Sequence, residues 1–362
     1  MNEFVFKSAS LQKWVKSVFT HFHFSDTEAE TAAAVLLQAD LRGIDSHGVA
    51  RLSGYVRLIE KSRINPQPKM KLLRETPSTA TLDADAAVGL VSAPFAMQVA
   101  IEKAEKCGSG WVAVSNSNHF GIAAHHTMLA LPHNMIGFAM TNASPLVTPA
   151  MGAERMLGTN PICVAIPAGE EPPFVLDMAT SAASNGKLEI AERKQKEIPG
   201  GWLVKNDGSE SHNPAELKQG GMLLTLGSDM DHGSYKGYGL SAWVDIFSGV
   251  LSGANFGPWV PPFVSFLDPS PDAPGKGIGH FVGAWRVDGF REVSEFKQQM
   301  DLWIRRFRNT KPAAGIPVGI PGDFERKTAE EREVNGIPLI DKVIDDLKQI
   351  ADKTGLPLPE FS

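Results

Sequence analysis

The stretch PICVAIPAGEEPPFVLDMAT, Pro161 to Thr180, decides the fold class of this chain. It contains two runs rich in β-forming residues, 161–168 and 173–180, and the segment between them is too short for a helix. Parallel neighbours in a sheet are joined by a crossover of roughly a dozen or more residues, usually a helix. We therefore expect an antiparallel or mixed sheet rather than the all-parallel sheet of a doubly wound fold.

Helical and extended patterns alternate on both sides of this stretch. The predicted elements are helices over 92–108, 122–133, 235–253 and 294–309, and strands over 110–117, 135–142 and 278–290. The alternation predicts an α/β unit over residues 79–295. The glycine-rich run GKGIGHFVG, 275–283, is not a dinucleotide fingerprint, because Val282 stands where its last glycine is needed and a strand follows.

Both ends of the chain carry helical patterns. Apolar residues recur at helical spacing over 10–22, and Ser25 with Glu28 forms a capping box before a second helix that ends at Leu41. A third helix is predicted to start near Ser46. Further helical runs lie around 328–334 and 339–353. We expect one helical domain built from residues 1–78 and 296–362.

Composition narrows the class of protein. The 362 residues carry 35 Lys and Arg against 41 Asp and Glu, a formal charge of -6, which gives no electrostatic case for a nucleic-acid partner. Cys107 and Cys163 have neither disulfide-framework nor zinc-ligand spacing, so we expect a reducing compartment and no metal. The N-terminal segment lacks the features of a signal peptide, and no run is apolar enough to span a membrane. These features predict a cytoplasmic protein that uses neither nucleic acid nor membrane.

The first candidate site is RGIDSHGVAR, Arg42 to Arg51, where a helix stops at Gly43 and a Ser-His pair follows. If Ser46 caps the next helix, His47 and Arg51 stand four residues apart on one helical face. Arginine can hold a carboxylate by two hydrogen bonds, while histidine gives or takes a proton at the adjacent oxygen. The motif predicts chemistry on a small anion. The alternative is that Ser46 is only a helix cap and His47 a surface residue.

Three more segments carry candidate residues. His119 lies between an extended run and Gly121, at a junction whose backbone amides favour phosphate or carboxylate groups. Asp177 ends an extended run, where it could accept hydrogen bonds from a ribose, or form an Asx turn or helix cap instead. Lys236 could meet a phosphate or a nicotinamide carboxamide, or be a solvated lysine at a helix start.

Taken together and in order, several motifs resemble those of the malate/L-lactate dehydrogenase family, which is distinct from the Rossmann dehydrogenases. They are ADLRGIDSHGVARL (39–52), SNHFGIAAHH (117–126), GTNPICVAIPA (158–168), LDMATS (176–181), KGYGLS (236–241) and IPGDFE (320–325). The resemblance runs from about Leu11 to Leu339 and extends to ureidoglycolate and sulfolactate dehydrogenases, diketogulonate reductases and piperideine-2-carboxylate reductases. It implies a nicotinamide-dependent oxidoreductase with a non-Rossmann, mixed-sheet α/β cofactor domain, working as a homodimer.

The resemblance also implies roles for single residues. His47 matches the usual acid/base, next to Ser46, while Arg51 matches the residue that holds the substrate carboxylate, and Thr141 is assigned to substrate binding as well. His119 matches a position beside the nicotinamide that serves as proton acceptor in ureidoglycolate dehydrogenases, so the choice between His47 and His119 stays open. The residues assigned to the cofactor are His119, Phe120, Gly121, Thr159, Asp177, Met178, Ala179, Lys236, Pro321, Gly322 and Asp323.

Two features of this chain depart from the relatives. Lys187 stands where the imine-reducing members have an aspartate, and residues 252–266 supply an aromatic wall. We expect reversible conversion of a small 2-oxo acid into its 2-hydroxy acid with NAD or NADP, NAD being favoured. Lys187, Arg193 and Lys194 are the candidates for contacting the extra phosphate of NADP. The alternatives are reduction of a cyclic imine acid and a catalytically silent ligand-binding homologue.

Overall fold

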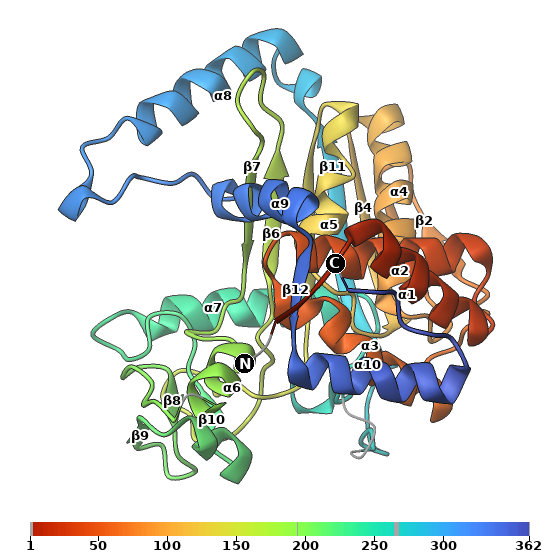
Figure 1. The fold of residues 1–362 in the computed structure, drawn as a ribbon. Helices are drawn as coiled ribbons and strands as arrows, with labels where there is room; N and C mark the ends of the chain where they lie inside the picture. The colour runs from red at the N-terminus through yellow and green to blue at the C-terminus, as the bar shows by residue number, and fades with distance from the viewer. Residues whose placement is uncertain (1–2, 194, 264–267, 362) are drawn as a thin grey trace.

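The computed structural model describes residues 3–193, 195–263 and 268–361, and a seven-stranded sheet forms its centre (Figure 1). The strands are β1 (Glu3–Phe6), β2 (Lys71–Glu75), β3 (Thr79–Asp83), β4 (Ser109–Ser117), β5 (Met135–Thr141), β6 (Ile162–Ile166), β7 (Phe174–Met178), β8 (Leu203–Val204), β9 (Glu210–Ser211), β10 (Met222–Leu223), β11 (Ile278–Arg286) and β12 (Ile337–Ile340). The helices are α1 (Ser8–His21), α2 (Asp26–Leu41), α3 (Leu52–Glu60), α4 (Gly89–Cys107), α5 (Ala123–Met128), α6 (Asn185–Arg193), α7 (Ser234–Asp245), α8 (Val293–Arg308), α9 (Asp323–Asn335) and α10 (Asp341–Thr354). Within the described ranges, none of these helices is long and apolar enough to cross a bilayer.

The central sheet is mixed, with the strand order β2-β3-β4-β11-β5-β6-β7. Strands β6 and β7 pair antiparallel, with Ile162 opposite Met178, as the stretch at 161–180 predicts. The parallel pair is β3 with β4, and helix α4 joins those two strands. The expected mixed α/β fold is therefore confirmed.

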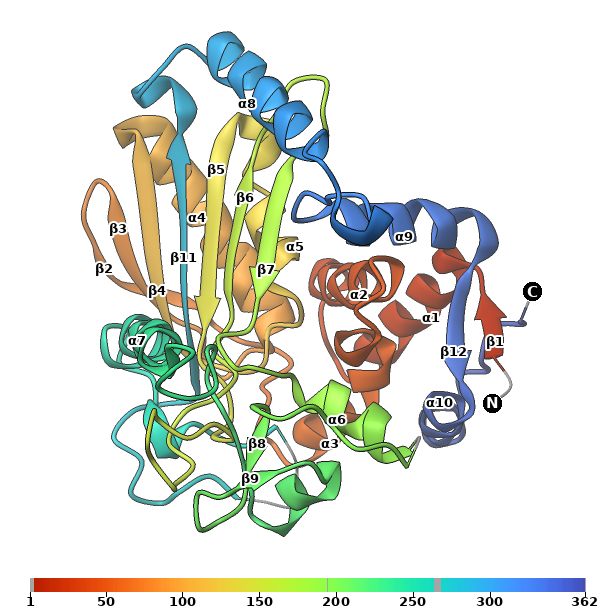
Figure 2. The same cartoon turned by 90° about the vertical axis from the view of Figure 1, so that its left-hand side faces the viewer.

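The two faces of the sheet are covered differently. Helices α4 and α5 pack on one face through small apolar side chains such as Ala96, Ala100 and Ala124 (Figure 2). The other face carries aromatic rings, and α7 with the π-helical turn after it (246–250) packs against part of them. The sheet therefore lies between α4 and α5 on one face and α7 on the other.

The two ends of the chain meet in a helical unit beside the sheet (Figure 2). Strand β1 pairs antiparallel with β12, with Phe6 opposite Ile337. Helices α1, α2, α3 and α10 share one apolar core, which includes Phe19, Leu36 and Leu347. The predicted capping box of Ser25 and Glu28 is present at the start of α2.

The element bounds refine the predicted segments. Strand β2 pairs with β3, so it belongs to the sheet although it lies within the segment 1–78. Residue 295 falls inside α8, which extends beyond the turn between β6 and β7 (Figure 1). We propose that the unit containing the sheet starts near β2 and includes α8.

A smaller unit lies beneath the sheet. It contains the three-stranded sheet β10-β8-β9, helix α6 and their own apolar core, which includes Val147, Leu188 and Leu223. Gly186, near the start of α6, lies against the loop that follows α2, since a Cβ atom there would be 3.2 Å from Ser46 Cβ. The smaller unit and the helical unit therefore meet at Ser46.

Candidate active site

The loop between α2 and α3 is folded more tightly than the sequence predicts. Residues 45–47 and 49–51 form two short 3-10 turns, and α3 begins only at Leu52. Ser46 does not cap that helix, because its cap position is occupied by Arg51. The prediction that His47 and Arg51 lie one α-helical turn apart on a helix starting near Ser46 is wrong.

A buried carboxyl group accounts for this conformation. Asp40, in the last turn of α2, is fully buried and accepts the backbone N–H of Val49 at 2.8 Å. This bond holds the chain extended at Gly48 (ψ -146°), between the two turns. Gly48 is required there because a Cβ atom would lie 1.9 Å from Oδ1 of Asp40. Asp40 thus shapes the loop that carries the candidate catalytic residues.

The loop nevertheless brings the three predicted residues together. Ser46 Oγ lies 2.9 Å from Nδ1 of His47. The Nε–H of Arg51 donates to the Ser46 carbonyl oxygen at 2.5 Å. Ser46 therefore touches both of its predicted partners, His47 through its hydroxyl group and Arg51 through its backbone.

His119 faces this loop from the sheet unit. Its ring stacks on that of His47, with 5.6 Å between centroids and an interplanar angle of 27°. The Tyr55 hydroxyl lies 2.6 Å from Nδ1 of His119. Phe263 packs on the rings of His119 and Tyr55 at 4.8 and 5.0 Å, and the Arg51 guanidinium lies 6.0 Å from its centroid. Phe263 is thus one described residue of the predicted aromatic wall, and residues 264–266 of that wall lie outside the described part of the chain.

Tyr55 is a site residue that the sequence did not predict. It is completely buried on the apolar stripe of α3, where a tyrosine resembles an ordinary core residue. The available signal was its position four residues after Arg51. Its partner His119 is 64 residues away, so only the folded chain reveals the contact.

Burial and positive charge dominate the electrostatics of this site. Burial, together with the charge of Arg51, lowers the pKa of His47 to about 4. Burial also lowers the pKa of His119 well below its usual range, and repulsion from the charge of Arg51, and from His47 when that ring is protonated, adds to this effect. Both rings are neutral at pH 7, and Arg51 is the charged group available to an anionic ligand.

The predicted cofactor residues Asp177, Met178 and Ala179 lie at the end of β7. The Asp177 carboxylate accepts the backbone N–H of Ala124, at the start of α5, at 2.8 Å. Asp177 therefore binds the first turn of a helix 53 residues earlier in the chain, a contact that the sequence did not suggest. Burial raises its pKa to about 6, while the bond to Ala124 and the charge of Arg42 act in the opposite direction.

Thr159 lies on a loop adjoining the end of this strand, and Lys236 lies in the first turn of α7. The Thr180 N–H donates to the Thr159 carbonyl at 2.9 Å, and the Leu226 N–H donates to the Thr180 carbonyl at 3.0 Å. The first turn of α7 packs on the same loop, since a Cβ atom on Gly237 would lie 2.1 Å from the Leu226 carbonyl oxygen. Lys236 is exposed there. The exposed cation in the first turn of α7 suits a ligand that carries a phosphate group.

Thr141 and Phe120 point into the interior instead. The Thr141 hydroxyl lies 2.7 Å from Nδ1 of His280 and donates to the Gly279 carbonyl at 2.9 Å. The Phe120 ring stacks on His280 at 4.9 Å. Thr141 is directed there because it lies opposite His280 in the pairing of β5 with β11. Within the described part of the chain, neither side chain forms a hydrogen bond or a ring contact with the His47 loop. Gly121, the residue after Phe120, turns the chain toward α5 with a φ of 77°.

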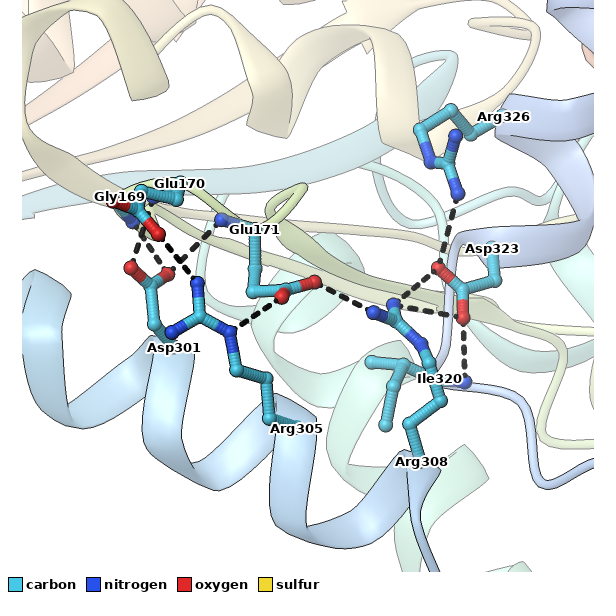
Figure 3. Close-up of polar contacts among 9 residues, drawn as sticks. All are labelled: Gly169, Glu170, Glu171, Asp301, Arg305, Arg308, Ile320, Asp323 and Arg326. Atoms are coloured by element: carbon cyan, nitrogen blue, oxygen red, sulfur yellow. Dashed lines mark hydrogen bonds and ion pairs between the residues drawn. The ribbon is translucent and has the colours of Figure 1, made fainter.

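Pro321, Gly322 and Asp323 lie along the outer edge of the sheet. The Val175 N–H of β7 donates to the Pro321 carbonyl at 3.0 Å. The Asp323 carboxylate contacts Arg308 at 3.1 Å and accepts the Ile320 N–H at 3.1 Å (Figure 3). These contacts place the segment near β7 but commit the Asp323 carboxylate to protein partners.

Figure 3 shows the network to which Asp323 belongs. Arg308 bridges Asp323 and Glu171, which lies 2.6 Å away in the turn between β6 and β7. Arg305 contacts the same Glu171 at 2.8 Å, and Asp301 accepts backbone N–H groups of that turn at 2.9 to 3.1 Å. The network fastens α8 to the sheet and α9 to α8.

Of the three candidates for the NADP phosphate, Lys187 has a described side chain. The exposed Lys187 places its Nζ 5.6 Å from the ring centroid of Trp202, in the smaller unit. Lys194 and the side chain of Arg193 lie outside the described part of the chain.

Comparison with known proteins covers almost the whole chain. Residues 6–348 match the family described as malate/L-lactate dehydrogenase. A malate dehydrogenase of Pyrococcus abyssi is 42% identical over 348 residues, which cover 96% of this chain and 94% of that protein. The L-sulfolactate dehydrogenase of Methanocaldococcus jannaschii is 34% identical over 357 residues, 99% of each chain. The crystal structure of malate dehydrogenase from Entamoeba histolytica matches with a TM-score of 0.92 at 33% identity, covering 99% of this chain and 100% of that one. The resemblance in the motifs is confirmed: the chain belongs to the malate/L-lactate dehydrogenase family and is a hydroxy-acid dehydrogenase.

Proposed function

We propose that the protein interconverts a small 2-hydroxy acid of the malate or sulfolactate type and its 2-oxo acid, with His47 as acid/base and Arg51 as the carboxylate ligand. The observation that carries this proposal is the loop itself. Ser46 contacts both a titratable ring and a fixed guanidinium group, at 2.9 and 2.5 Å. Such a pair can hold the carboxylate of a substrate and move a proton at the neighbouring oxygen.

His47 suits proton transfer because its hydrogen-bond partner, the Ser46 hydroxyl group, can either donate or accept as the charge of the ring changes. The Ser46 hydroxyl can donate to Nδ1 of the neutral ring and accept from Nδ1–H of the protonated ring. With a pKa of about 4, His47 is neutral in the free protein and can take the hydroxyl proton of a 2-hydroxy acid. In the reverse direction, a bound carboxylate offsets the charge of Arg51 and favours the protonated ring.

A bound nicotinamide supplies or accepts the hydride at the carbon that Arg51 and His47 orient. We propose that it is held by His119, Gly121, Thr159, the strand end at 177–179 and Lys236, whose backbone groups and exposed cation suit it. We favour NAD over NADP, because the carboxylates of Asp177 and Glu325 influence each other and would repel a second phosphate at a nearby ribose.

We also propose a homodimer that works in the cytoplasm. Helix α7 and the turn after it expose large apolar side chains, namely Tyr235, Tyr238, Trp243, Ile246, Val250 and Leu251. Monomeric proteins rarely expose a continuous patch of this kind, and a second copy would cover it. Ile246→Asp should therefore shift the protein from dimer to monomer in sedimentation velocity. Both cysteines are unpaired, which suits a reducing compartment.

The proposed activity is tested by following nicotinamide absorbance with NADH or NADPH and a panel of acids. The panel contains oxaloacetate, sulfopyruvate, pyruvate and a cyclic imine acid. We expect turnover of 2-oxo acids and more efficient use of NADH. Turnover of the imine acid alone would establish the rival activity, against which the exposed Lys187 stands. Cofactor binding without any turnover would identify a silent binding protein.

A further inference from the structure

The hydrogen bonds around His119 determine which of its nitrogens carries the proton. The backbone N–H of Gly121 points at Nδ1 from 3.3 Å, and the Tyr55 hydroxyl lies 2.6 Å from the same atom. A backbone amide can only donate, so Nδ1 must be an acceptor. The proton of the neutral ring is therefore on Nε2, and Nε2 is the nitrogen left to meet a ligand.

This arrangement differs from that of His47 in one decisive respect. A serine hydroxyl can reverse its role when the His47 ring gains a proton, whereas the Gly121 amide cannot. A proton on Nδ1 of His119 would face the Gly121 N–H. It would also force the Tyr55 hydroxyl to turn and accept.

The charges near His119 act in the same direction. The groups that bear on it are His47, Arg51, His126 and His280, and each of them is cationic when it is charged. The Phe263 ring at 4.8 Å adds an apolar wall. An imidazolium at this position would thus lack a compensating anion among these neighbours.

We propose that His119 stays a neutral Nε2–H hydrogen-bond donor throughout the cycle, that the Gly121 N–H fixes this tautomer, and that Tyr55 is a positioning residue that holds the ring through the same nitrogen. Its ligand is the C2 oxygen of the acid, on which negative charge develops as hydride arrives, while His47 delivers the proton. This inference rests on the proposed function for its ligand. It assigns proton transfer to His47 and electrostatic stabilisation to His119.

Matched substitutions separate a donor from an acid/base. The glutamine amide can place an N–H near the position of Nε2, whereas the asparagine amide reaches only the position of Nδ1. Removing one such donor typically lowers turnover by roughly a hundredfold to a thousandfold. We expect this loss for His119→Ala and His119→Asn, but a loss within about tenfold for His119→Gln, with the pH profile of the wild type. Equal losses in all three variants would overturn the proposal.

The tautomer is measured without substrate or cofactor by nitrogen-15 NMR of the imidazole groups. We expect the His119 signals of protonated Nε2 and unprotonated Nδ1 to stay unchanged from about pH 8 to about pH 5. Tyr55→Phe should keep this tautomer but shift the Nδ1 resonance, because the hydroxyl contact is lost while the Gly121 N–H remains. An unchanged Nδ1 resonance would remove Tyr55 from the positioning role. A proton on Nδ1, or titration of His119 in this range, would overturn the inference. Wild-type protein that is inactive on every acid would refute the proposed function, and the NMR result would still decide the tautomer.

Discussion

Replacing the buried Asp40 by asparagine should change how the stability of this protein depends on pH. Asp40 is 0% exposed, and its Oδ1 has no hydrogen-bond partner among the described residues. Its Oδ2 accepts the Val49 N–H at 2.8 Å. Burial raises the pKa of this carboxyl from 3.8 to about 8. At pH 7 the folded protein therefore holds a proton on Asp40 that the unfolded chain has already lost.

The magnitude follows from proton linkage. Between the two pKa values the folded state binds more protons than the unfolded state, so stability falls as the pH rises. One proton corresponds to about 1.4 kcal/mol per pH unit, hence about 2.7 kcal/mol of unfolding free energy between about pH 5 and pH 7. Asparagine cannot ionise and keeps a carbonyl oxygen for Val49, but its amide N–H groups face Gly48 without an acceptor. This defect costs roughly 1–3 kcal/mol at every pH.

Urea unfolding of Asp40→Asn and the wild type at about pH 5, 6 and 7 measures the effect, and subtraction cancels the other titrating groups. We expect the variant to be less stable than the wild type at about pH 5. The difference between their unfolding free energies should then shrink by about 2–3 kcal/mol by about pH 7. Asp352→Asn, at an exposed position of α10, is the control and should show a constant difference. A constant difference for Asp40→Asn as well would refute the reasoning that this carboxyl is protonated in the fold.

Four further predictions concern the catalytic loop. His47→Ala should lower turnover at least about a hundredfold while NADH binding persists in a fluorescence titration, since a positioned proton carrier is worth roughly two to four powers of ten; near-normal turnover would remove His47 from this role. In the wild type, kcat/KM for a hydroxy acid should stay level from about pH 8 to about pH 5 and then fall with a midpoint near the His47 pKa of about 4. The reason is that a protonated His47 cannot take a proton from the substrate. A midpoint at the ordinary histidine pKa would contradict this assignment. Arg51→Lys should raise KM for the acid about tenfold or more and leave the Kd of NADH unchanged, because an ammonium cannot form a planar two-point contact; an unchanged KM would exclude Arg51 from substrate binding. Gly48→Ala should lower the free energy of unfolding by roughly 1–3 kcal/mol and remove most of the turnover, because the added Cβ would lie 1.9 Å from Asp40. The control is Gly289→Ala, which should match the wild type because a Cβ on Gly289 meets nothing within 4 Å.

Local sequence patterns sufficed for the fold class and for part of the site. The run at 161–180 allowed no helix, and its two strands pair antiparallel as a consequence. The Ser25 capping box starts α2 because both of its partners lie within one turn. Ser46, His47 and Arg51 were recognised together because six residues of chain contain all three. Each of these features depends on neighbours in the sequence, whose geometry the backbone restricts.

Only the tertiary structure decided how these parts act on one another. Residues 45–51 form two tight turns where local spacing predicts an α-helix, because the buried carboxyl group of Asp40 accepts the Val49 N–H. Strand pairing turns Thr141 inward, and ion pairs commit the Asp323 carboxylate to Arg308.

The contact that orients the His119 ring is also long-range, since Tyr55 comes from a helix 64 residues earlier in the chain. A hydroxyl group from another element meets an imidazole nitrogen only after the chain has packed. Periodicity and spacing in the sequence encode the faces of single elements, whereas burial and hydrogen-bond direction arise when those elements are assembled.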